Sequence, residues 1–277
     1  MTLKIVTDSA CDVPEALARE LDITIVPVYI NVGEQSYLEG VGLTRRAFYE
    51  NLPNYHPYPT TAAPPEGTFT ETYERLAAEG ATEILSIHIA SGLSATYNAA
   101  RLGAAATQVP VTLFDTQQIT LGAGLLVLAA AEAAAAGQTL SEVTDMLTAA
   151  VTRTRVFGMI DNLDSLRRSG RVNWAQFGLG TLLQIKPVMM IQAGEISIAA
   201  RVRTRKRSLR HMVEMVAEFQ PFERLAIIHV HAPAVADALR RQAAHLLTEN
   251  EPLIAEITPA IGIHLGLGAV GFAAVSR

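Results

Sequence analysis

The chain of 277 residues is 49% hydrophobic and 18% charged, and it contains 19 glycines and 13 prolines. This composition excludes intrinsic disorder and low-complexity architectures. The length fits one large or two ordinary domains, because single hydrophobic cores stop growing at about 250–300 residues.

The sequence predicts neither a membrane span nor an exported protein. Its longest apolar run, residues 121–136, is interrupted by Glu132 and is shorter than the roughly 20 residues that span a bilayer. Asp8 precedes any apolar segment of a signal peptide, and the single cysteine, Cys11, cannot form a disulfide within the chain. We therefore expect a soluble, cytoplasmic globular protein.

The net charge of −5 conceals an uneven distribution. Residues 152–210 contain twelve lysines and arginines but only three acids, so this segment has a net charge of +9 and the rest of the chain has a net charge of −14. A segregated basic segment favours a defined anionic partner over a general nucleic-acid surface. The alternative is a solvated helix face that contains several arginines.

The first half of the chain alternates short apolar segments with helical ones. The predicted strands, rich in Val and Ile, are residues 3–7, 23–28, 84–89 and 111–115. One predicted helix follows Asp12 and Pro14, and a second, over 45–52, begins after a Thr44 cap. Further helices are predicted over 94–107, 121–136 and 141–152. This alternation predicts an α/β domain with a mainly parallel sheet flanked by helices. Ligands of such sheets bind at the carboxyl ends of the strands.

The second half follows a different pattern. Five prolines between Pro53 and Pro65 indicate an irregular crossing loop or lid before it. Residues 186–192 and 195–199 around Ala193-Gly194 predict a β-hairpin, and a basic helix is expected over 204–219. Further expected elements are strands at 225–231 and 253–258 and a helix at 235–247. We therefore expect two domains, an N-terminal α/β domain over 1–154 and a C-terminal α+β domain over 155–277.

Several motifs in the sequence resemble cofactor or metal sites. Gly266-Leu-Gly268-Ala-Val-Gly271 matches a dinucleotide fingerprint, but only six residues follow it, too few for the required helix and acid. His229-Val-His231 could place two imidazoles on one face of a strand, yet no other metal ligand accompanies them, and a strand-end pair is the favoured interpretation. Cys11 lies among acids, so a core position is favoured over a nucleophile. We expect no cofactor and no metal.

Polar residues gather where the predicted strands end. Thr7-Asp8-Ser9, Ser91-Gly-Leu-Ser94-Ala-Thr96-Tyr97 and Asp115-Thr116 each follow a strand. Hydroxyl groups beside the free N–H groups of a helix N-terminus suit an oxyanion such as carboxylate or phosphate. Each turn by itself is more simply explained as a helix cap, but several at one sheet edge favour an anion site.

Six blocks of the sequence, spread in order over the whole chain, resemble motifs of the DegV family. Residues 8–12 are similar to its D-S-x-x-D opening, residues 91–97 to S-x-L-S-G-T-Y, and residues 166–172 to L-x-x-G-G-R-I. Residues 185–187 match I-K-P, residues 203–207 match R-T-x-K-K, and residues 262–269 match G-x-H-x-G-P-G-A. Each block is weak alone, but six in order are specific.

The resemblance implies a function. Characterised members of the family are fatty-acid-binding subunits of bacterial fatty acid kinase, in which a tunnel between two domains holds a long-chain fatty acid. A separate ATP-binding kinase subunit phosphorylates the carboxylate and supplies acyl phosphate to phospholipid synthesis. By motif, Thr61, Ser94, Arg171 and His264 would bind the carboxylate, and Arg203 would face the kinase. The chain would therefore be a substrate-binding subunit rather than an enzyme, with no transmembrane segment and at most transient contact with a membrane surface.

The sequence departs from the family motifs at several positions. They are Ala62, Ala63, Ala95, Ser169, Leu265 and Leu267. None replaces a proposed carboxylate ligand, so the departures bear on the shape of the pocket and on the preferred acyl chain.

Two other functions remain as alternatives. The first is a self-contained hydrolase or acyltransferase that uses Ser94 and His264 with Asp8 or Asp115, although no G-x-S-x-G motif is present. The second is a nucleic-acid binder that uses residues 201–210. The low aromatic content of 6% and the negative net charge argue against it.

Overall fold

The computed structural model describes residues 2–161, 163–172, 185–247 and 252–277. Its first sheet has the strand order β2-β1-β6-β7, and all neighbouring strands are parallel. The strands are β1 (Leu3–Asp8), β2 (Ile23–Val26), β6 (Glu83–His88) and β7 (Val111–Asp115). The predicted parallel sheet is therefore confirmed. Strand β2 ends at Val26, before Pro27, rather than at the expected residue 28.

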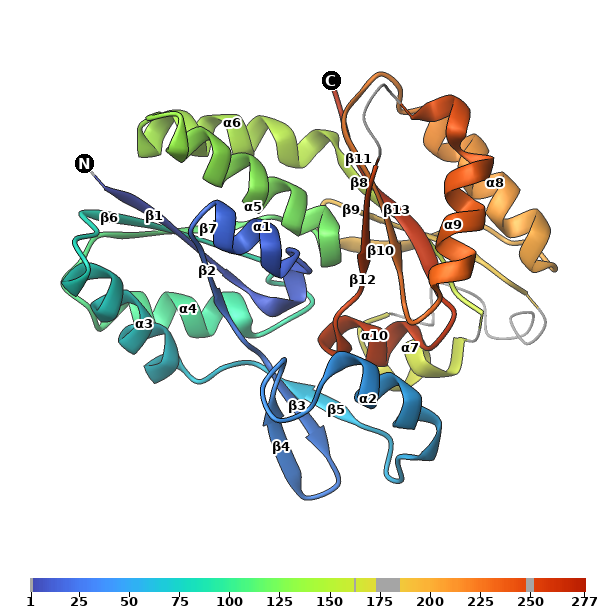
Figure 1. The fold of residues 1–277 in the computed structure, drawn as a ribbon, viewed down its shortest axis with the longest axis horizontal. Coiled ribbons are helices and arrows are strands. Elements are labelled where there is room, and N and C mark those ends of the chain that lie inside the picture. Colours follow the sequence, from blue (N-terminus) through green and yellow to red (C-terminus); the bar gives the residue numbers. More distant parts are fainter. Residues whose placement is uncertain (1, 162, 173–184, 248–251) are drawn as a thin grey trace.

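Helices cover both faces of this sheet (Figure 1). On one face lie α3 (Glu66–Ala78) and α4 (Thr96–Ala105), and on the other lie α1 (Glu15–Glu20), α5 (Thr120–Ala135) and α6 (Leu140–Arg153). Side chains alternate across the sheet as the pleat requires: Val6 packs with α3 and α4, whereas Ile5 packs in the core cluster that includes α5.

Helix α5 explains the long apolar run of the sequence. It contacts strands of both large sheets, so nearly its whole surface is buried. A Cβ atom on Gly122 would lie 2.3 Å from Val156, and one on Gly124 would lie 2.3 Å from the carbonyl oxygen of Cys11. Glycine at these two positions therefore permits the close approach of α5 to its neighbours on each side.

The second large sheet has six strands in the order β10-β9-β8-β13-β11-β12. They are β8 (Thr154–Met159), β9 (Val188–Gln192), β10 (Glu195–Ala200), β11 (Phe222–His229), β12 (Leu253–Glu256) and β13 (Val270–Ser276). Only the β11–β12 pairing is parallel. Helices α8 (Arg205–Ala217) and α9 (Pro233–Gln242) cover one face, and α5 contacts the other. The last helical turn expected over 235–247 is the separate 3₁₀ turn η5 (Ala244–Leu246).

A smaller layer lies below the two large sheets in Figure 1. It contains the antiparallel strands β3 (Tyr29–Val32), β4 (Gln35–Leu38) and β5 (Thr60–Ala62), with α2 (Arg45–Asn51) and the 3₁₀ turn η2 (Leu52–Asn54). The short helices α7 (Leu163–Ser169) and α10 (Pro259–Leu265) lie beside this layer.

The expectation that residues 53–65 are irregular is wrong in part. Strand β5 pairs with the edge of β3, and Pro59 and Pro64 flank the strand without interrupting it. Pro53 lies at the start of η2, a position where its missing N–H costs no hydrogen bond. The prolines therefore delimit short elements rather than prevent them.

The predicted Thr44 cap and the predicted hairpin turn are confirmed, whereas the predicted Asp12 cap is wrong. The Thr44 hydroxyl accepts a hydrogen bond from the Ala47 N–H at 3.2 Å, as expected of a helix cap. The hairpin β9–β10 turns at Ala193 and Gly194, both with positive φ (49° and 78°), as a type I′ turn requires. The expected Asp12 cap is wrong: helix α1 begins after Pro14, and the Asp12 side chain binds elsewhere. No helix among the described residues is both long and apolar enough to cross a membrane.

Candidate functional site

A cavity of about 550 Å³ opens at the carboxyl ends of β1 and β6, where it meets β5, β10, α7 and α10. This is the edge at which ligands of parallel sheets bind. Its walls come from both halves of the chain and consist of Ala10, Val28, Thr61, Ala62, Ala63, Ile89, Ser91, Gly92, Leu93, Ser94, Ala95, Thr96, Ile119, Leu166, Ser169, Arg171, Ile196, Ala260, Ile261, His264 and Leu265.

Thr61 and His264 form a polar pair in one wall. Strand β5 presents Thr61 and the last turn of α10 presents His264, and the Thr61 hydroxyl oxygen lies 3.3 Å from Nε2 of His264. Burial, together with the nearby positive charge of Arg171, lowers the pKa of His264 to about 4. The imidazole is therefore neutral at pH 7 and can donate one hydrogen bond while it accepts another.

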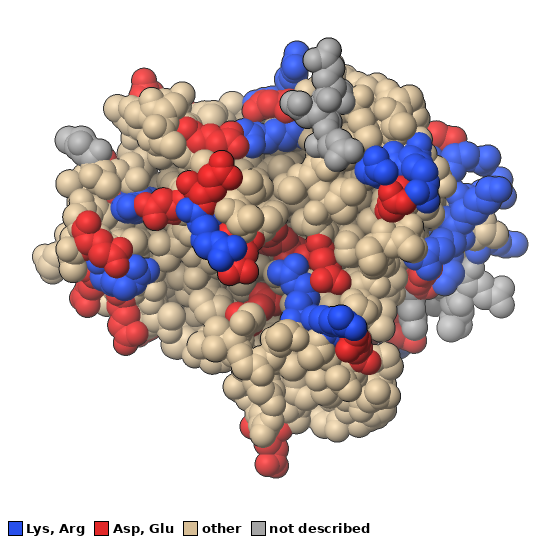
Figure 2. All heavy atoms as spheres, in the orientation of Figure 1, with Lys and Arg blue, Asp and Glu red and all other residues tan. Residues whose placement is uncertain are grey.

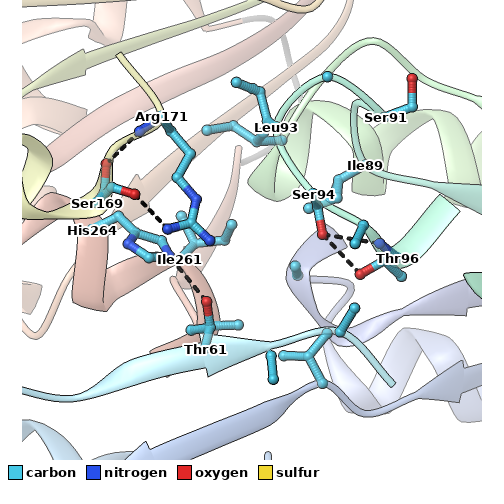
Figure 3. A pocket seen from close by; sticks show the side chains of 18 of the residues that line it. Thr61, Ile89, Ser91, Leu93, Ser94, Thr96, Ser169, Arg171, Ile261 and His264 are labelled. Carbon is cyan, nitrogen blue, oxygen red and sulfur yellow. Dashed lines mark hydrogen bonds between the residues drawn. The ribbon is translucent and has the colours of Figure 1, made fainter. Parts of the chain in front are cut away.

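Ser94 lies across the cavity from this pair (Figure 3). It precedes α4, which begins at Thr96, and its Oγ accepts a hydrogen bond from the Thr96 N–H at 3.2 Å. The Thr96 hydroxyl lies 2.9 Å from the same Oγ. The expected position of Ser94 at a helix N-terminus is confirmed, and the positive end of a helix dipole favours an anion.

Arg171 follows α7 and lies with His264 and Thr61 in Figure 3. Its backbone N–H donates to the Ser169 hydroxyl at 3.2 Å, and its guanidinium donates to the Ser169 carbonyl oxygen. The Ser169 hydroxyl in turn donates to the Leu166 carbonyl at 2.6 Å. Ser169 stands where the family motif has glycine. Its hydroxyl group therefore links the Leu166 carbonyl of α7 to the backbone N–H of Arg171.

The structure brings together all four residues that the motifs indicated for a carboxylate. Thr61, Ser94, Arg171 and His264 line one cavity. Arg203 lies elsewhere, exposed in the connection between β10 and α8. Of the departures from the motifs, Ala62, Ala63, Ala95, Ser169 and Leu265 also line the cavity, whereas Leu267 is an exposed side chain.

Most of the remaining wall residues are apolar, and most of these were not assigned to the site from the sequence. Ile89, Leu93, Ile119, Ile196 and Ile261 are among these residues. A small pocket of about 30 Å³ shares Ile119 and Leu265 with the cavity, and most of its other lining residues are apolar residues of the second sheet. Isolated isoleucines on different elements give no signal in sequence that they face one space. Together with the polar residues they give the cavity a lining that suits an amphiphile with an anionic head.

Two buried carboxylates hold the start of α10, which presents His264. The Thr258 N–H donates to Asp12 at 2.8 Å, and the Ala260 N–H donates to Glu39 at 2.7 Å. Burial raises the pKa of Asp12 to about 6 and that of Glu39 to about 7. Nothing in the sequence singled out Glu39, because an acid in a turn ordinarily lies in solvent.

The residues of the hydrolase alternative are engaged separately. Oδ2 of Asp8 lies 2.8 Å from Nδ1 of the buried His88, not beside His264. Asp115 accepts hydrogen bonds from the backbone N–H groups of Ser91 and Gln117. Ser94 faces Thr96, so the described contacts give no nucleophile–base–acid series that includes both Ser94 and His264.

The other motifs lie outside the cavity. Strand β11 ends at His229, so His231 does not share a strand face with it; His231 lies 3.2 Å from Glu256. Within the described residues, no group of three or more His, Cys, Asp or Glu side chains is arranged to hold a metal ion. Cys11 is buried, and burial raises the pKa of its thiol. The glycines 266–271 lead from α10 into β13, the reverse of the strand-to-helix order of a dinucleotide site.

The chain is similar to known proteins over its whole length. The family model described as an uncharacterised protein of the DegV family matches residues 2–277. A DegV domain-containing protein of Deinococcus radiodurans is 36% identical over 278 residues, which cover 99% of this chain and 98% of that protein. A solved structure of a DegV family protein from Thermus thermophilus, whose description refers to fatty acid binding, is 33% identical in sequence to this chain. The two have a TM-score of 0.90, with full coverage of both chains. DegV from Bacillus subtilis, described as a fatty acid binding protein, is 28% identical with a TM-score of 0.90 and equally complete coverage.

Proposed function

This chain belongs to the DegV family, and on that premise we propose that it binds a long-chain fatty acid whose carboxylate is held by Thr61, Ser94, Arg171 and His264. The observation that supports the proposal is the convergence of these four residues on one cavity from four separate elements. The relatives described as fatty-acid-binding proteins support the same ligand class.

The cavity has the chemistry that such a ligand needs. Burial of an acyl chain contributes ~0.8 kcal/mol per CH₂ group, so an apolar tunnel supplies most of the affinity. A buried carboxylate is costly unless donors compensate it. Arg171 supplies a permanent positive charge, and the hydroxyl groups and neutral imidazole supply further hydrogen bonds.

We propose further that the chain presents this carboxylate to a separate ATP-dependent kinase subunit and is not itself the catalyst. The carboxylate would attack the γ-phosphorus of ATP on the partner, ADP would leave, and the acyl phosphate would feed phospholipid synthesis. The proposal keeps the cytoplasmic location expected from the sequence, and no cofactor beyond the bound fatty acid. It also keeps the division into domains at 1–154 and 155–277, with the cavity between them.

The basic segment is the proposed docking face for the kinase. Figure 2 shows lysine and arginine side chains gathered on the side of the molecule where α8 lies. Arg205 is tied inward to Asp161 and to the carbonyl of Gly268, whereas Arg203, Lys206, Arg207 and Arg210 are exposed. Exposed cations of this kind steer an acidic partner.

A comparison of two ligands tests the carboxylate site. Delipidated protein should bind a long-chain fatty acid at least tenfold more tightly than the fatty alcohol of equal length, because only the acid uses the charge of Arg171. Arg171→Gln should remove most of this preference, whereas Arg167→Gln, on the neighbouring helix but outside the cavity, should preserve it. Equal affinity of the unmodified protein for acid and alcohol would contradict the proposal.

A further inference from the structure

A second cavity lies behind the pair formed by Thr61 and His264. It has a volume of about 220 Å³ and lies between the segment that leads into β5 and helices α7 and α10. Its walls are Tyr58, Pro59, Thr60, Thr61, Ser165, Arg168, Ser169, Arg171, Ile263 and His264. Thr61, Ser169, Arg171 and His264 line both cavities, so the two spaces meet at the proposed carboxylate site.

The second cavity differs from the first in its lining. Most of its residues offer hydrogen-bond donors: two guanidinium groups, several hydroxyls and an imidazole. The guanidinium of Arg168, an exposed side chain, lies over the ring of Tyr58, 5.0 Å from its centroid, an arrangement in which the N–H groups in the guanidinium plane stay available for hydrogen bonds. The Tyr58 hydroxyl is fixed by Ser165 and by the Ile263 carbonyl, each at 3.1 Å.

No carboxylate of the described residues forms an ion pair with the two arginines of this cavity. Neither Arg168 nor Arg171 has such a partner within 4.0 Å, whereas nine other arginines do. Two guanidinium groups around one small polar space are the arrangement that proteins use for phosphate, because a guanidinium binds phosphate oxygens in a bidentate manner.

We infer that this second cavity is an oxyanion pocket for a phosphate group. Its principal ligand is Arg168, which does not line the carboxylate site. The inference rests on the proposed function, since a phosphate there would adjoin a carboxylate held by Thr61 and His264. A phosphoryl group attached to the acyl carboxylate is one source of this chemistry, and free phosphate is the other. In the first case the protein retains the acyl phosphate, with the acyl chain in the first cavity and the phosphoryl oxygens in the second.

Three ligands and four proteins test the inference. The ligands are a long-chain fatty acid, an alkyl phosphate of equal chain length, and inorganic phosphate added to fatty-acid-loaded protein. The proteins are the parent, Arg168→Gln, Arg168→Lys and the control Arg167→Gln, which removes an exposed arginine one position away that lines neither cavity. Affinities are measured by calorimetry, and ³¹P NMR monitors the phosphate. Circular dichroism checks that each variant is folded.

The expected result is selective. Arg168→Gln should weaken the alkyl phosphate about tenfold or more, as for the loss of one charge-assisted hydrogen bond, and should change fatty-acid affinity less than about twofold. Arg168→Lys, which keeps the charge, should recover part of the loss, and Arg167→Gln should have no effect. If inorganic phosphate instead binds the loaded protein in an Arg168-dependent manner, the pocket is confirmed and its occupant is free phosphate.

Other results overturn the inference. If neither phosphate ligand depends on Arg168, or if Arg168→Gln weakens acid and alkyl phosphate equally, the second cavity is not a phosphate pocket. In either case fatty-acid binding by the parent protein leaves the proposed function intact. If the parent binds no fatty acid, the proposed function fails and the inference fails with it.

Discussion

In the wall of the first cavity, the imidazole of His264 and the guanidinium of Arg171 lie near each other, and they would contribute differently to the proposed anion binding. The pKa of His264 is lowered to about 4, so at pH 7 its ring offers a hydrogen bond without charge. Arg171 supplies the charge and also disfavours protonation of the imidazole. In the proposed site, therefore, only the exposed Arg171 carries a positive charge, and the buried imidazole stays neutral.

At this scale we expect Ser94→Ala and His264→Ala each to weaken fatty-acid binding by ~1–3 kcal/mol, the usual effect of removing one hydrogen-bond partner of a charged group. Titration calorimetry with delipidated protein measures the effect. Ser141→Ala, at the exposed start of α6, serves as the matched control and should bind normally. Parent-like affinity in both site variants would remove these residues from the carboxylate site.

At the level of elements, Asp12 and Glu39, which accept hydrogen bonds from the start of α10, predict a pH dependence of the protein's stability. The pKa of Glu39 is raised from 4.5 to about 7, so the folded protein retains a proton that the unfolded chain releases between these values. Stability from this group therefore falls as pH rises from about 4.5 to 7 and is constant above that interval. Asp12, raised from 3.8 to about 6, acts in the same direction at lower pH.

Glu39→Gln isolates this effect, because glutamine keeps an acceptor for the Ala260 N–H but cannot ionise. The variant should be more stable than the parent at pH 8 by up to about 3 kcal/mol, and the gain should disappear toward pH 4.5. Urea unfolding at several pH values measures the difference, with the exposed Glu34→Gln as control. A gain of equal size at every pH would show that Glu39 does not titrate in this way.

Helix α10 also packs too closely against α2 to admit a larger residue at its centre. A Cβ atom on Gly262 would lie 2.0 Å from the hydroxyl oxygen of Tyr49, which donates to the Ile257 carbonyl at 2.7 Å. Gly262→Ala should therefore destabilise the protein by ~1–3 kcal/mol and weaken fatty-acid binding, because α10 must move with His264.

Thermal unfolding and calorimetry check the Gly262 prediction. The control Gly67→Ala introduces a Cβ into open space in α3 and should be neutral or slightly stabilising. Tyr49→Phe in the Gly262→Ala background should recover part of the binding loss. Unchanged stability and binding in Gly262→Ala would mean that α10 does not fix the position of His264.

The elements that could be predicted from the sequence are those whose local pattern agrees with their environment. Short runs rich in Val and Ile gave β1, β6 and β7, and the Ala193-Gly194 dipeptide gave the hairpin. Strand β13 was missed because it is rich in alanine and glycine. A Cβ on Gly271 would lie 2.0 Å from the carbonyl oxygen of Phe157, so small residues there reflect close packing that no local pattern shows.

The candidate site was predictable only in part for a similar reason. Thr61 and His264 are separated by 203 positions, and neither spacing nor periodicity links them. Their association with Ser94 and Arg171 came from the family resemblance. Glu39, Arg168 and the isoleucines of the wall acquire their roles only when the chain is folded, because each belongs to a different element.

On the scale of the whole molecule, the exposed cations Arg203, Lys206, Arg207 and Arg210 do not line the fatty-acid cavity, so the proposal assigns binding and presentation to different residues. Arg203→Ala should leave fatty-acid affinity within about twofold of the parent and slow acyl-phosphate formation with the cognate kinase subunit, because exposed cations act mainly on association rate. Added salt should reproduce part of the defect in the unmodified protein.

The control for Arg203 is Arg19→Ala, which removes an exposed arginine of α1 outside the basic segment. Initial rates are measured at low protein concentration, where association limits turnover. Parent-like turnover in Arg203→Ala under these conditions would leave the basic segment as a solvated helix face without a role in docking.

Native mass spectrometry of the protein as purified tests the central proposal most directly, since it identifies a retained ligand by mass alone. We expect a non-covalent adduct whose mass equals that of a long-chain fatty acid, lost on denaturation and restored by adding the acid to delipidated protein. Ser94→Ala and His264→Ala should show a smaller bound fraction under the same conditions. A retained nucleotide or metal ion, or a delipidated protein that takes up no fatty acid, would contradict it.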